Sequence, residues 1–427
     1  MVPSESERPV QGRRVVVTGI GAVSPNGVGR EAFWSAVRGG VSGVKPITAF
    51  DVSHLPTRIA GIVDGFDPAD VLSSNDLKHV PRVVPLALKA SSEALEDAGL
   101  DPLAMELPER RRFGVVIGSG GAGLEFIERQ FRQYYLDDPK GVSLYTIPSS
   151  TPGSLSSELS MKFSLRGPSH VISTGCTSST DAIGHAMSLI RYGRSDRVLV
   201  GGSDSPIGPG IVTGFCLMKI MSTGWNDEPA RASRPFSKDR DGFVLAEGSW
   251  MLVLEERDRA RARGARVYAE ILGYGATCEA FHRVRLDENG EEPARAMNLA
   301  LEDAGIGPSD VDYLNLHGTS TQLNDRIETR AVKRVFGARA ADIPASSLKS
   351  MIGHPQGACG AGGVAVSILA MRDSFLPPTI NREVPDPECD LDVIPGAGRE
   401  RRAETVLCNC IGFGSKNAAL VLRADAA

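Results

Sequence analysis

The sequence predicts an α/β fold made of two related halves, and two observations support this prediction. Apolar strands and helices alternate along the 427 residues, of which 41% are hydrophobic, enough for a large core. The helix end Ala94–Leu100 (ALEDAGL) recurs as Ala300–Ile306 (ALEDAGI), and each copy leads into an apolar strand ending in glycine, Phe113–Gly118 and Val311–Gly318. Such repeats indicate duplicated units, although helix ends of this composition also arise by coincidence.

The halves are placed at residues 13–263 and 264–427, and the first is predicted to open with a buried strand and a glycine turn over Arg13–Pro25. This turn does not fit a dinucleotide site, because Ser24 stands where the third glycine belongs and Pro25 follows directly. The next predicted elements are a helix over 30–39, an amphipathic helix over Pro85–Gly99, an ordered loop over Ser233–Gly248, a buried strand over Trp250–Glu255 and a charged helix over 256–263.

The stretch around Cys176 is predicted to form a strand, a sharp turn and a helix. His170–Thr174 favours a strand, Gly175 supplies the turn, and Asp181–Ile190 reads as a helix. At such a bend the positive end of the helix dipole and the unpaired backbone N–H groups favour a thiolate and can bind an oxyanion. Cys176 is therefore a candidate nucleophile; the competing interpretation is a small buried apolar residue.

The second half carries two histidines beside glycines, His317 and His354, and Lys349 precedes the second of them. The segment Ala345–His354 leads into a small-residue helix, Ala361–Met371, placed in its half much as the Cys176 helix is in the first. A pseudo-twofold relation between the halves would bring the two sites together. A histidine beside a glycine turn is often structural, but a thiolate with two imidazoles is enough for acyl transfer followed by carbanion chemistry.

The composition argues against several classes of protein. A net charge of −5, without a run of five or more Lys or Arg residues, argues against a nucleic-acid partner. The seven cysteines are scattered without a CxxC pair, so their spacing indicates neither a disulfide framework nor a zinc site. The segment Met1–Pro9 is polar and acidic, and no stretch reaches the ~18 apolar residues of a membrane span. We expect a cytoplasmic protein with a short disordered lead and no membrane partner.

Four motifs stand in the order seen in β-ketoacyl synthases, and the chain resembles that family from Val15 to Leu422. The motifs are Gly175–Ser179 (GCTSS), His317–Thr321 (HGTST), Lys349–His354 (KSMIGH) and Gly412–Gly414 (GFG). The resemblance implies a thiolase-like fold, with two duplicated halves in a five-layered αβαβα core, and carbon–carbon bond formation on acyl carrier protein. It implies a homodimer or a heterodimer with a chain-length factor. Substrates would be attached to the phosphopantetheine of the carrier protein, and no cofactor or metal is expected.

Within that family the chain most resembles the catalytic ketosynthase (alpha) subunit of type II polyketide synthases. The segments that carry this likeness are Ser203–Ile207, Asn226–Pro229 and Asn324–Thr329. Three positions depart from that branch. Ser179–Thr180 replaces the usual Gly-Leu, Ser415–Lys416 replaces a second glycine and its neighbour, and Cys410 stands where a serine is usual. An elongating ketoacyl synthase of fatty-acid synthesis is the alternative assignment.

The resemblance also implies a role for each residue of the expected catalytic group. Cys176 would take the acyl chain from the carrier protein. His317 and His354 would act as neutral hydrogen-bond donors to the malonyl thioester carbonyl and so stabilise the enolate. Lys349 would supply positive charge and pair with Glu328, holding the histidine geometry.

Further residues would bind the substrate or its carrier. By resemblance, the backbone N–H groups of Cys176 and Phe413 form the oxyanion hole, and Phe413 also gates the second substrate. Thr319 and Thr321 would bind the pantetheine amides, although such hydroxyls also cap turns. Because carrier proteins are acidic, three cationic residues are candidate docking residues: Lys78, Arg82 and Lys219.

Three other functions remain as alternatives. A thiolase acting on coenzyme A esters shares the fold, and Cys410 in its glycine-rich segment resembles the second thiolase cysteine, but that enzyme would have asparagine at position 317. A chain-length factor is a binding subunit that lacks the nucleophile, whereas this chain keeps Cys176. A cysteine hydrolase would need an asparagine or aspartate to orient its histidine, and none is evident.

Overall fold

The computed structural model describes residues 12–414 and 416–425. The expected lead over Met1–Pro9 and the departure at Ser415 lie outside these residues. Among the described helices, none is long and apolar enough to cross a membrane.

Within the described residues, one 11-stranded sheet contains two five-strand blocks and the short β2 (Gly27–Val28), which pairs with β1. The strands of the first block are β1 (Val15–Ser24), β5 (Phe113–Gly118), β6 (Ser169–Ile172), β7 (Arg197–Asp204) and β8 (Gly248–Glu256). The strands of the second block are β9 (Ala269–Cys278), β10 (Tyr313–Asn315), β11 (Ala345–Ser346), β14 (Thr405–Gly412) and β15 (Lys416–Ala424).

The two blocks have the same topology. The first runs β6-β5-β7-β8-β1 and the second runs β11-β10-β14-β15-β9, so each reads third, second, fourth, fifth, first along its own chain. In both blocks the first two pairings are parallel and the last two antiparallel. Among the described strands, the two blocks are hydrogen-bonded to each other where β1 pairs with β9, through Val16 with Glu270 and Val17 with Ala269.

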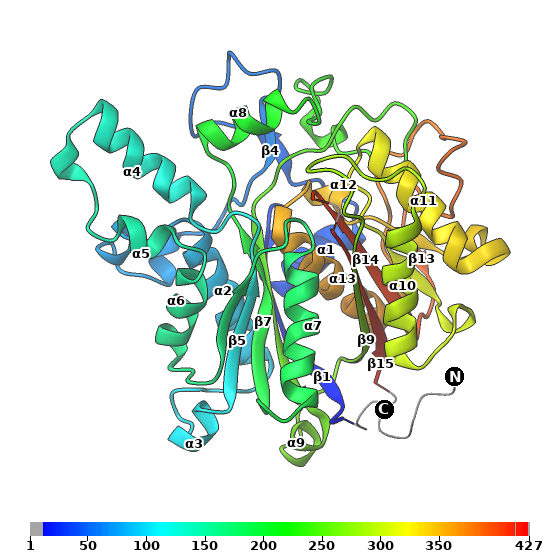
Figure 1. The fold of residues 1–427 in the computed structure, drawn as a ribbon, viewed down its shortest axis with the longest axis horizontal. Coiled ribbons are helices and arrows are strands. Elements are labelled where there is room, and N and C mark those ends of the chain that lie inside the picture. Colours follow the sequence, from blue (N-terminus) through cyan, green and yellow to red (C-terminus); the bar gives the residue numbers. More distant parts are fainter. Residues whose placement is uncertain (1–11, 415, 426–427) are drawn as a thin grey trace.

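Helices lie between the blocks and outside them (Figure 1). The principal helices are α2 (Val83–Asp97), α6 (Ser154–Phe163), α7 (Ser178–Arg191), α10 (Glu291–Ala304), α11 (Gln322–Phe336) and α13 (Cys359–Asp373). Helices α7 and α13 contact each other and strands of both blocks, so they form the central layer. Helices α2 and α6 cover the first block, and α10, with α11 against it, covers the second. These contacts give the αβαβα layering expected from the resemblance.

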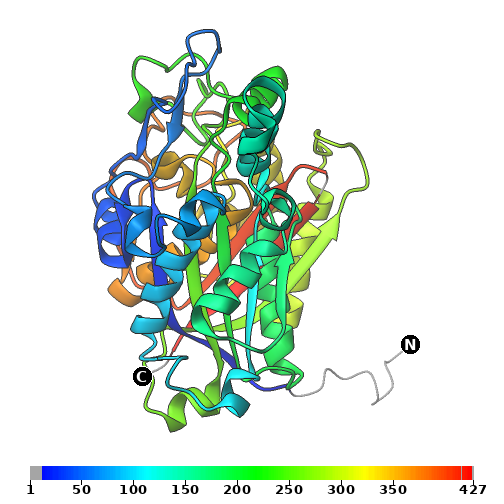
Figure 2. The same cartoon turned by 90° about the vertical axis from the view of Figure 1, so that its left-hand side faces the viewer.

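Short elements and loops gather at one end of the strands, where Figure 1 and Figure 2 both show them above the sheet. The remaining elements named in the figures or below are α1 (Arg30–Arg38), β3 (Val44–Pro46), β4 (Ile59–Gly61), α3 (Leu107–Arg110), α4 (Leu124–Leu136), α5 (Thr146–Ser150), α8 (Pro209–Leu217), α9 (Arg257–Ala262), α12 (Lys349–Ile352), β12 (Phe375–Leu376) and β13 (Arg399–Glu400). The helices predicted over 30–39 and Pro85–Gly99 are confirmed as α1 and α2.

Paired glycines on β1 and β9 allow a helix to pack directly on each strand. A Cβ added at Gly21 would lie 1.9 Å from the carbonyl oxygen of Ala90 on α2, and one at Gly275 would lie 2.2 Å from that of Ala296 on α10. Gly19 and Gly273 make the same approach one turn further along their helices. The prediction of a glycine turn after Arg13 is wrong, because β1 continues through both glycines to Ser24. The glycines serve close packing, not a bend.

Replacing Gly275 with alanine is expected to destabilise the protein by about 1–3 kcal/mol or more, because the new methyl group meets helix backbone and cannot move aside. Urea unfolding of the purified variant measures this change. Gly214→Ala on α8 is the matched control: nothing lies within 4 Å of a Cβ built there, so its stability should stay the same or rise by up to about 1 kcal/mol. Equal unfolding midpoints for the two variants would contradict the packing argument.

Candidate active site

Cys176 lies on a rigid elbow between β6 and α7. Gly175 takes a φ of +72°, which glycine adopts without strain. The Ser178 hydroxyl donates to the Gly175 carbonyl (2.6 Å) and accepts from the Thr174 N–H (2.9 Å), which closes the turn. Helix α7 begins at Ser178, so the thiol stands at its N-terminus. The predicted strand, turn and helix are therefore confirmed, and Cys176 is only 4% exposed.

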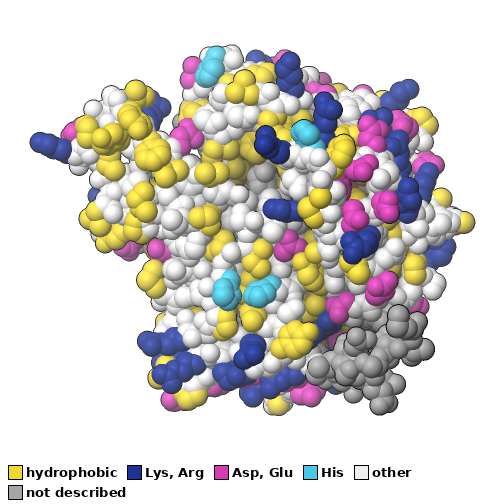
Figure 3. All heavy atoms as spheres, in the orientation of Figure 1, with side chains coloured by type: hydrophobic (Ala, Val, Ile, Leu, Met, Phe, Trp, Pro, Cys, Tyr) yellow, Lys and Arg dark blue, Asp and Glu magenta, His cyan; other side chains and the backbone are white. Residues whose placement is uncertain are grey.

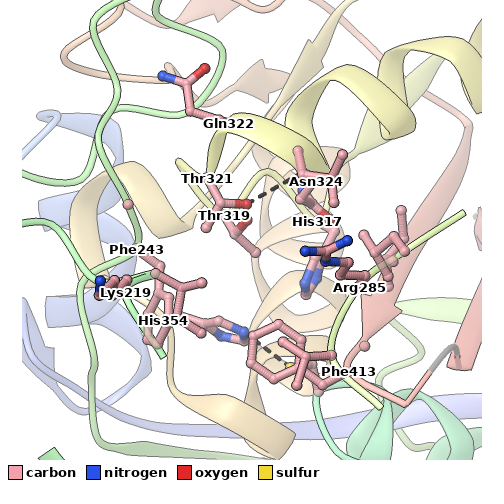
Figure 4. A pocket seen from close by; sticks show the side chains of 18 of the residues that line it. Lys219, Phe243, Arg285, His317, Thr319, Thr321, Gln322, Asn324, His354 and Phe413 are labelled. Carbon is pink, nitrogen blue, oxygen red and sulfur yellow. Dashed lines mark hydrogen bonds between the residues drawn. The ribbon is translucent and has the colours of Figure 1, made fainter. Parts of the chain in front are cut away.

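Two histidines from the second half reach this thiol. His317 follows β10, and His354 follows α12. The His354 Nε2 lies 3.2 Å from the Cys176 Sγ, the contact drawn as a dashed line in Figure 4. The two imidazole rings stand edge to face with their centroids 5.3 Å apart. A thiol and two imidazoles thus meet where the two halves of the chain join.

The loop predicted over Ser233–Gly248 is ordered and holds His354 in place. The backbone N–H of His354 donates to the Val244 carbonyl (2.7 Å), and the backbone carbonyl of His354 accepts from the Ala246 N–H (3.1 Å). The Phe243 ring packs edge-on against the imidazole, with centroids 5.6 Å apart. These contacts fix the ring opposite the thiol.

All three groups open into one cavity of about 240 Å³. Thr319, Thr321 and Phe413 also line it, together with Lys219 at its exposed edge. The lining is mainly apolar away from these groups, as expected for a site that takes an acyl chain. Six of the residues expected to act on substrate therefore share one cavity.

Lys349 and Glu328 lie behind His317, away from the cavity. The Lys349 ammonium donates to the His317 carbonyl (2.7 Å) and lies 3.3 Å from its Nδ1. The Glu328 carboxylate accepts from the backbone N–H groups of His317 (2.6 Å) and Gly318 (2.7 Å), and from Asn409. The expected Lys349–Glu328 pairing needs correction: among the described contacts, each binds His317 and they do not form an ion pair. They hold one histidine from two sides.

These surroundings keep His317 neutral. Burial, followed by the charge of Lys349, lowers the pKa of His317 to about 3. Because an ammonium can only donate, the Nδ1 beside Lys349 accepts, and the ring proton lies on Nε2. His317 therefore presents an N–H donor toward the cavity. Burial also raises the pKa of the Glu328 carboxyl to about 7, although its three hydrogen-bond donors oppose the shift.

The pKa of His354 is shifted in the opposite direction while Cys176 carries no acyl group. Burial lowers its pKa, but the charge of the Cys176 sulfur and the hydrogen bond to it, followed by the same two effects from Cys359, outweigh burial, so the pKa rises to about 9. Its Nδ1 has no hydrogen-bond partner among the described residues. The imidazolium therefore depends mainly on the Cys176 sulfur, and it loses this larger part of its support once an acyl group neutralises that sulfur.

His354→Asn is expected to slow alkylation of Cys176 by iodoacetamide by about tenfold or more at neutral pH, because the variant loses the cation that favours the thiolate. The prediction depends on the 3.2 Å contact between the His354 Nε2 and the Cys176 Sγ. Mass spectrometry of the Cys176 peptide follows the reaction in both proteins at the same neutral pH, and equal alkylation rates would contradict the role of His354 in activating the thiol.

The remaining predicted binding residues have different surroundings. The Thr319 and Thr321 hydroxyls lie 2.9 Å apart at the cavity wall, and Thr321 also caps α11. Lys219 and Lys78 are exposed. The guanidinium of Arg82 is partly exposed and forms two hydrogen bonds of 2.8 Å with the buried Glu247.

Some contacts of the site were not predicted from the sequence. Asp325 is fully buried and accepts from the Thr319 and Phe236 N–H groups, so it shapes the turn after His317. Arg285, from the loop after β9, reaches the cavity beside His317 (Figure 4). Cys359 and Cys410 lie directly behind the nucleophile. Most of these contacts join distant segments, so local patterns could not indicate them; the exception is the contact between Asp325 and Thr319, which are six residues apart.

Comparison with known proteins agrees with this geometry. The family model "Beta-ketoacyl synthase, N-terminal domain" matches residues 12–260, and "Beta-ketoacyl synthase, C-terminal domain" matches residues 268–383. The chain belongs to the β-ketoacyl synthase family. It is thus an acyltransferase that forms carbon–carbon bonds, and its fold is the thiolase-like fold of these synthases.

Similar proteins come from both branches of the β-ketoacyl synthases. The chain is 44% identical to 3-oxoacyl-[acyl-carrier-protein] synthase 2 of Coxiella burnetii, over 96% of this chain and 98% of that protein. It is 43% identical to the tetracenomycin polyketide synthase ketoacyl synthase alpha subunit of Streptomyces glaucescens, over 96% and 97%. A solved complex of a type II PKS acyl-carrier protein with its ketosynthase, bound to the hexaketide, matches with a TM-score of 0.90 and 36% identity, over 97% of this chain and 100% of that one.

Proposed function

We propose that this β-ketoacyl synthase joins a cysteine-bound acyl chain to malonyl carrier protein with loss of carbon dioxide, as part of type II polyketide biosynthesis. The observation that carries the proposal is the meeting of the Cys176 thiol, 3.2 Å from His354, with a neutral His317 in one cavity. A nucleophile alone would support many acyl transfers, but two further imidazoles suit a step that develops negative charge on oxygen.

In the first step the Cys176 thiolate attacks the thioester carbonyl of an acyl carrier protein. The carbon–sulfur bond to pantetheine breaks, and the departing thiolate takes the His354 proton. That transfer is favourable because acylation removes the negative charge that supported the imidazolium, leaving a buried ring whose Nδ1 has no partner among the described residues. Loading thus converts His354 to the neutral form that the next step requires.

In the second step malonyl carrier protein binds, and both imidazoles donate N–H hydrogen bonds to its thioester carbonyl. The bond to the carboxylate breaks, carbon dioxide leaves, and the electron pair forms an enolate stabilised by these donors. The enolate carbon attacks the Cys176 thioester, a carbon–carbon bond forms, and the thiolate is released. We propose that the N–H groups of Cys176 and Phe413 bind the oxyanion of the thioester steps. The close approach of Gly412 supports this, since a Cβ there would lie 3.3 Å from the Cys176 N.

The surface supports a paired assembly. Helices α4 and α5 form an arm that projects from the body, and Figure 3 shows hydrophobic side chains gathered on it. Tyr135 and Leu136 are each 74% exposed there, and large apolar patches of this kind usually mark protein contacts. One similar solved structure, with a TM-score of 0.90 and 32% identity, is the ishigamide ketosynthase/chain length factor. We therefore propose that this chain acts as a dimer, either with itself or with a chain-length factor.

Other parts of the proposal concern docking, organisation and location. Lys219 at the cavity edge, together with Lys78 and Arg82, would face the acidic carrier protein. The junction between halves is proposed near residues 263 and 264, which lie between α9 and β9. A cytoplasmic location suits seven free cysteines, one of them the nucleophile.

The pathway is tested by product analysis. Purified protein, malonyl carrier protein and an acyl starter are incubated with and without a partner subunit, and products are measured by mass spectrometry. Poly-β-keto chains from repeated condensation without reduction are expected for the polyketide assignment. Fatty-acid elongation is the second candidate, supported by the 44% identity to the Coxiella burnetii enzyme. A single condensation on saturated chains of many lengths would favour that candidate, and transfer to free coenzyme A alone would contradict both.

A further inference from the structure

Two more thiols lie directly behind the nucleophile. Cys359 at the start of α13 and Cys410 on β14 form one buried cluster with Cys176. Their sulfur atoms are 3.7 Å apart, and each S–H donates to the Cys176 carbonyl oxygen at 3.2 Å. The Cys410 Sγ also lies 3.4 Å from the His317 Nδ1. Two sulfurs, an imidazole nitrogen and a carbonyl oxygen therefore surround one point.

These separations match a tetrahedral zinc site. With Zn–S bonds of about 2.3 Å and Zn–N bonds of about 2.0 Å, two sulfurs in a tetrahedron stand about 3.8 Å apart, and a sulfur and a nitrogen about 3.5 Å. The observed separations are 3.7 Å and 3.4 Å. Thiolate and imidazole are also the ligands that zinc prefers among protein side chains. All three donor atoms lie within 4.8 Å of one another, so bringing them onto one ion needs only small side-chain movements.

We propose that Cys359, Cys410 and His317 form a zinc-binding site immediately behind the catalytic pocket. The sequence spacing concealed it, since the three ligands come from segments more than forty residues apart along the chain. The His317 Nδ1 suits the role because it already accepts from Lys349 and so carries a lone pair rather than a proton.

The charges around this point are compatible with a divalent ion. Lys349 lies 3.3 Å from the same nitrogen, and its ammonium would repel an isolated cation. Two thiolates cancel the charge of one zinc ion, so the occupied site adds no net charge beside the lysine. The ion would replace Lys349 as the partner of Nδ1 and hold the His317 ring and the Cys176 carbonyl together. Zinc is therefore expected to slow condensation.

Cys176 belongs to a second group of side chains that could hold a metal ion. The experiment must distinguish binding there from binding at Cys359, Cys410 and His317. Cys176, His317 and His354 also bring one ligand atom each within 4.8 Å of one another. Since both groups contain His317, a metal effect on the unmodified enzyme would not distinguish them. Cys176→Ala removes the thiol of the outer group and leaves both inner thiols in place, so it is the parent protein for the test.

The probe is Co²⁺, which occupies zinc sites and gives a thiolate-to-metal absorption band in proportion to the bound thiolates. Cys176→Ala protein is expected to bind one Co²⁺ per chain with this band, and Zn²⁺ should displace it. Adding Cys359→Ala or Cys410→Ser should weaken binding by about tenfold or more and reduce the band by half. Cys408→Ala is the matched control, since Cys408 is also buried on β14 but contacts Ser367 instead. This control should leave binding and the band unchanged.

Thermal unfolding provides the second measurement. Zinc should raise the midpoint of the Cys176→Ala protein, because an ion that binds only the folded state stabilises it. The rise should be absent in Cys359→Ala and Cys410→Ser proteins that unfold cooperatively without metal; Cys410→Ser, which keeps the side-chain shape, serves if the alanine variant does not fold. A band that persists in both thiol variants, or binding that follows Cys278 or another surface group, would mean an adventitious ion only and overturn the proposal.

Discussion

Cys176→Ala is expected to lower condensation by about 10⁴-fold or more, because no other group in the cavity can hold the acyl chain as a thioester. The variant should still bind malonyl carrier protein. It should also still release carbon dioxide from it, since both imidazoles remain. Product formation and carbon dioxide release are measured in parallel with purified carrier proteins. Loss of condensation with retained carbon dioxide release would show that the thiol acts in acyl transfer and not in decarboxylation.

The control for this variant is Cys278→Ala, which removes an exposed thiol on β9 and should leave condensation unchanged. Full condensing activity in the Cys176→Ala protein would end the proposed mechanism. So would loss of malonyl carrier protein binding together with condensation, because the cavity wall would then depend on the thiol itself.

His317→Ala is expected to reduce carbon dioxide release from malonyl carrier protein by about 10²–10³-fold, equivalent to about 3–4 kcal/mol, because the enolate loses one of its two N–H donors. Loading of Cys176 should fall far less, since His354 makes the 3.2 Å contact with the sulfur. Single-turnover acylation and carbon dioxide release are measured on the same preparation.

His185→Ala serves as the matched control for this variant. His185 lies on α7, with its ring 5.5 Å from that of His170 and not in the catalytic cavity. It should alter neither activity. Carbon dioxide release within about threefold of the unmodified enzyme in His317→Ala would contradict the role of His317 as an enolate donor.

The sequence predicted the catalytic residues better than the contacts that hold them in place. Cys176, His317 and His354 were recognisable because each lies in a short motif beside glycine, where the backbone must turn and the side chain is exposed to a site. The ALEDAG repeat pointed correctly to duplicated topology, because a helix that packs on a glycine-bearing strand constrains its own composition. The paired glycines of β1 were misread as a turn, since a glycine in a strand and one in a bend look alike without the helix that covers it.

The contacts behind the catalytic residues could not be predicted in the same way. Lys349 and Glu328 were expected to pair with each other, whereas each binds His317, and the pairing of Arg82 with Glu247 was not predicted. The cluster of Cys359 and Cys410 depends on α13 and β14 lying against the elbow. Such arrangements arise from the packing of distant segments and leave no periodic pattern in the chain.

The matching topology of the two blocks places the connection between β6 and α7 in correspondence with the connection between β11 and α13. The first connection carries Cys176, and the second, which is longer and includes α12, carries Lys349 and His354. Each half therefore supplies a different group to one shared site from a corresponding place in its topology, so neither half contains the site alone.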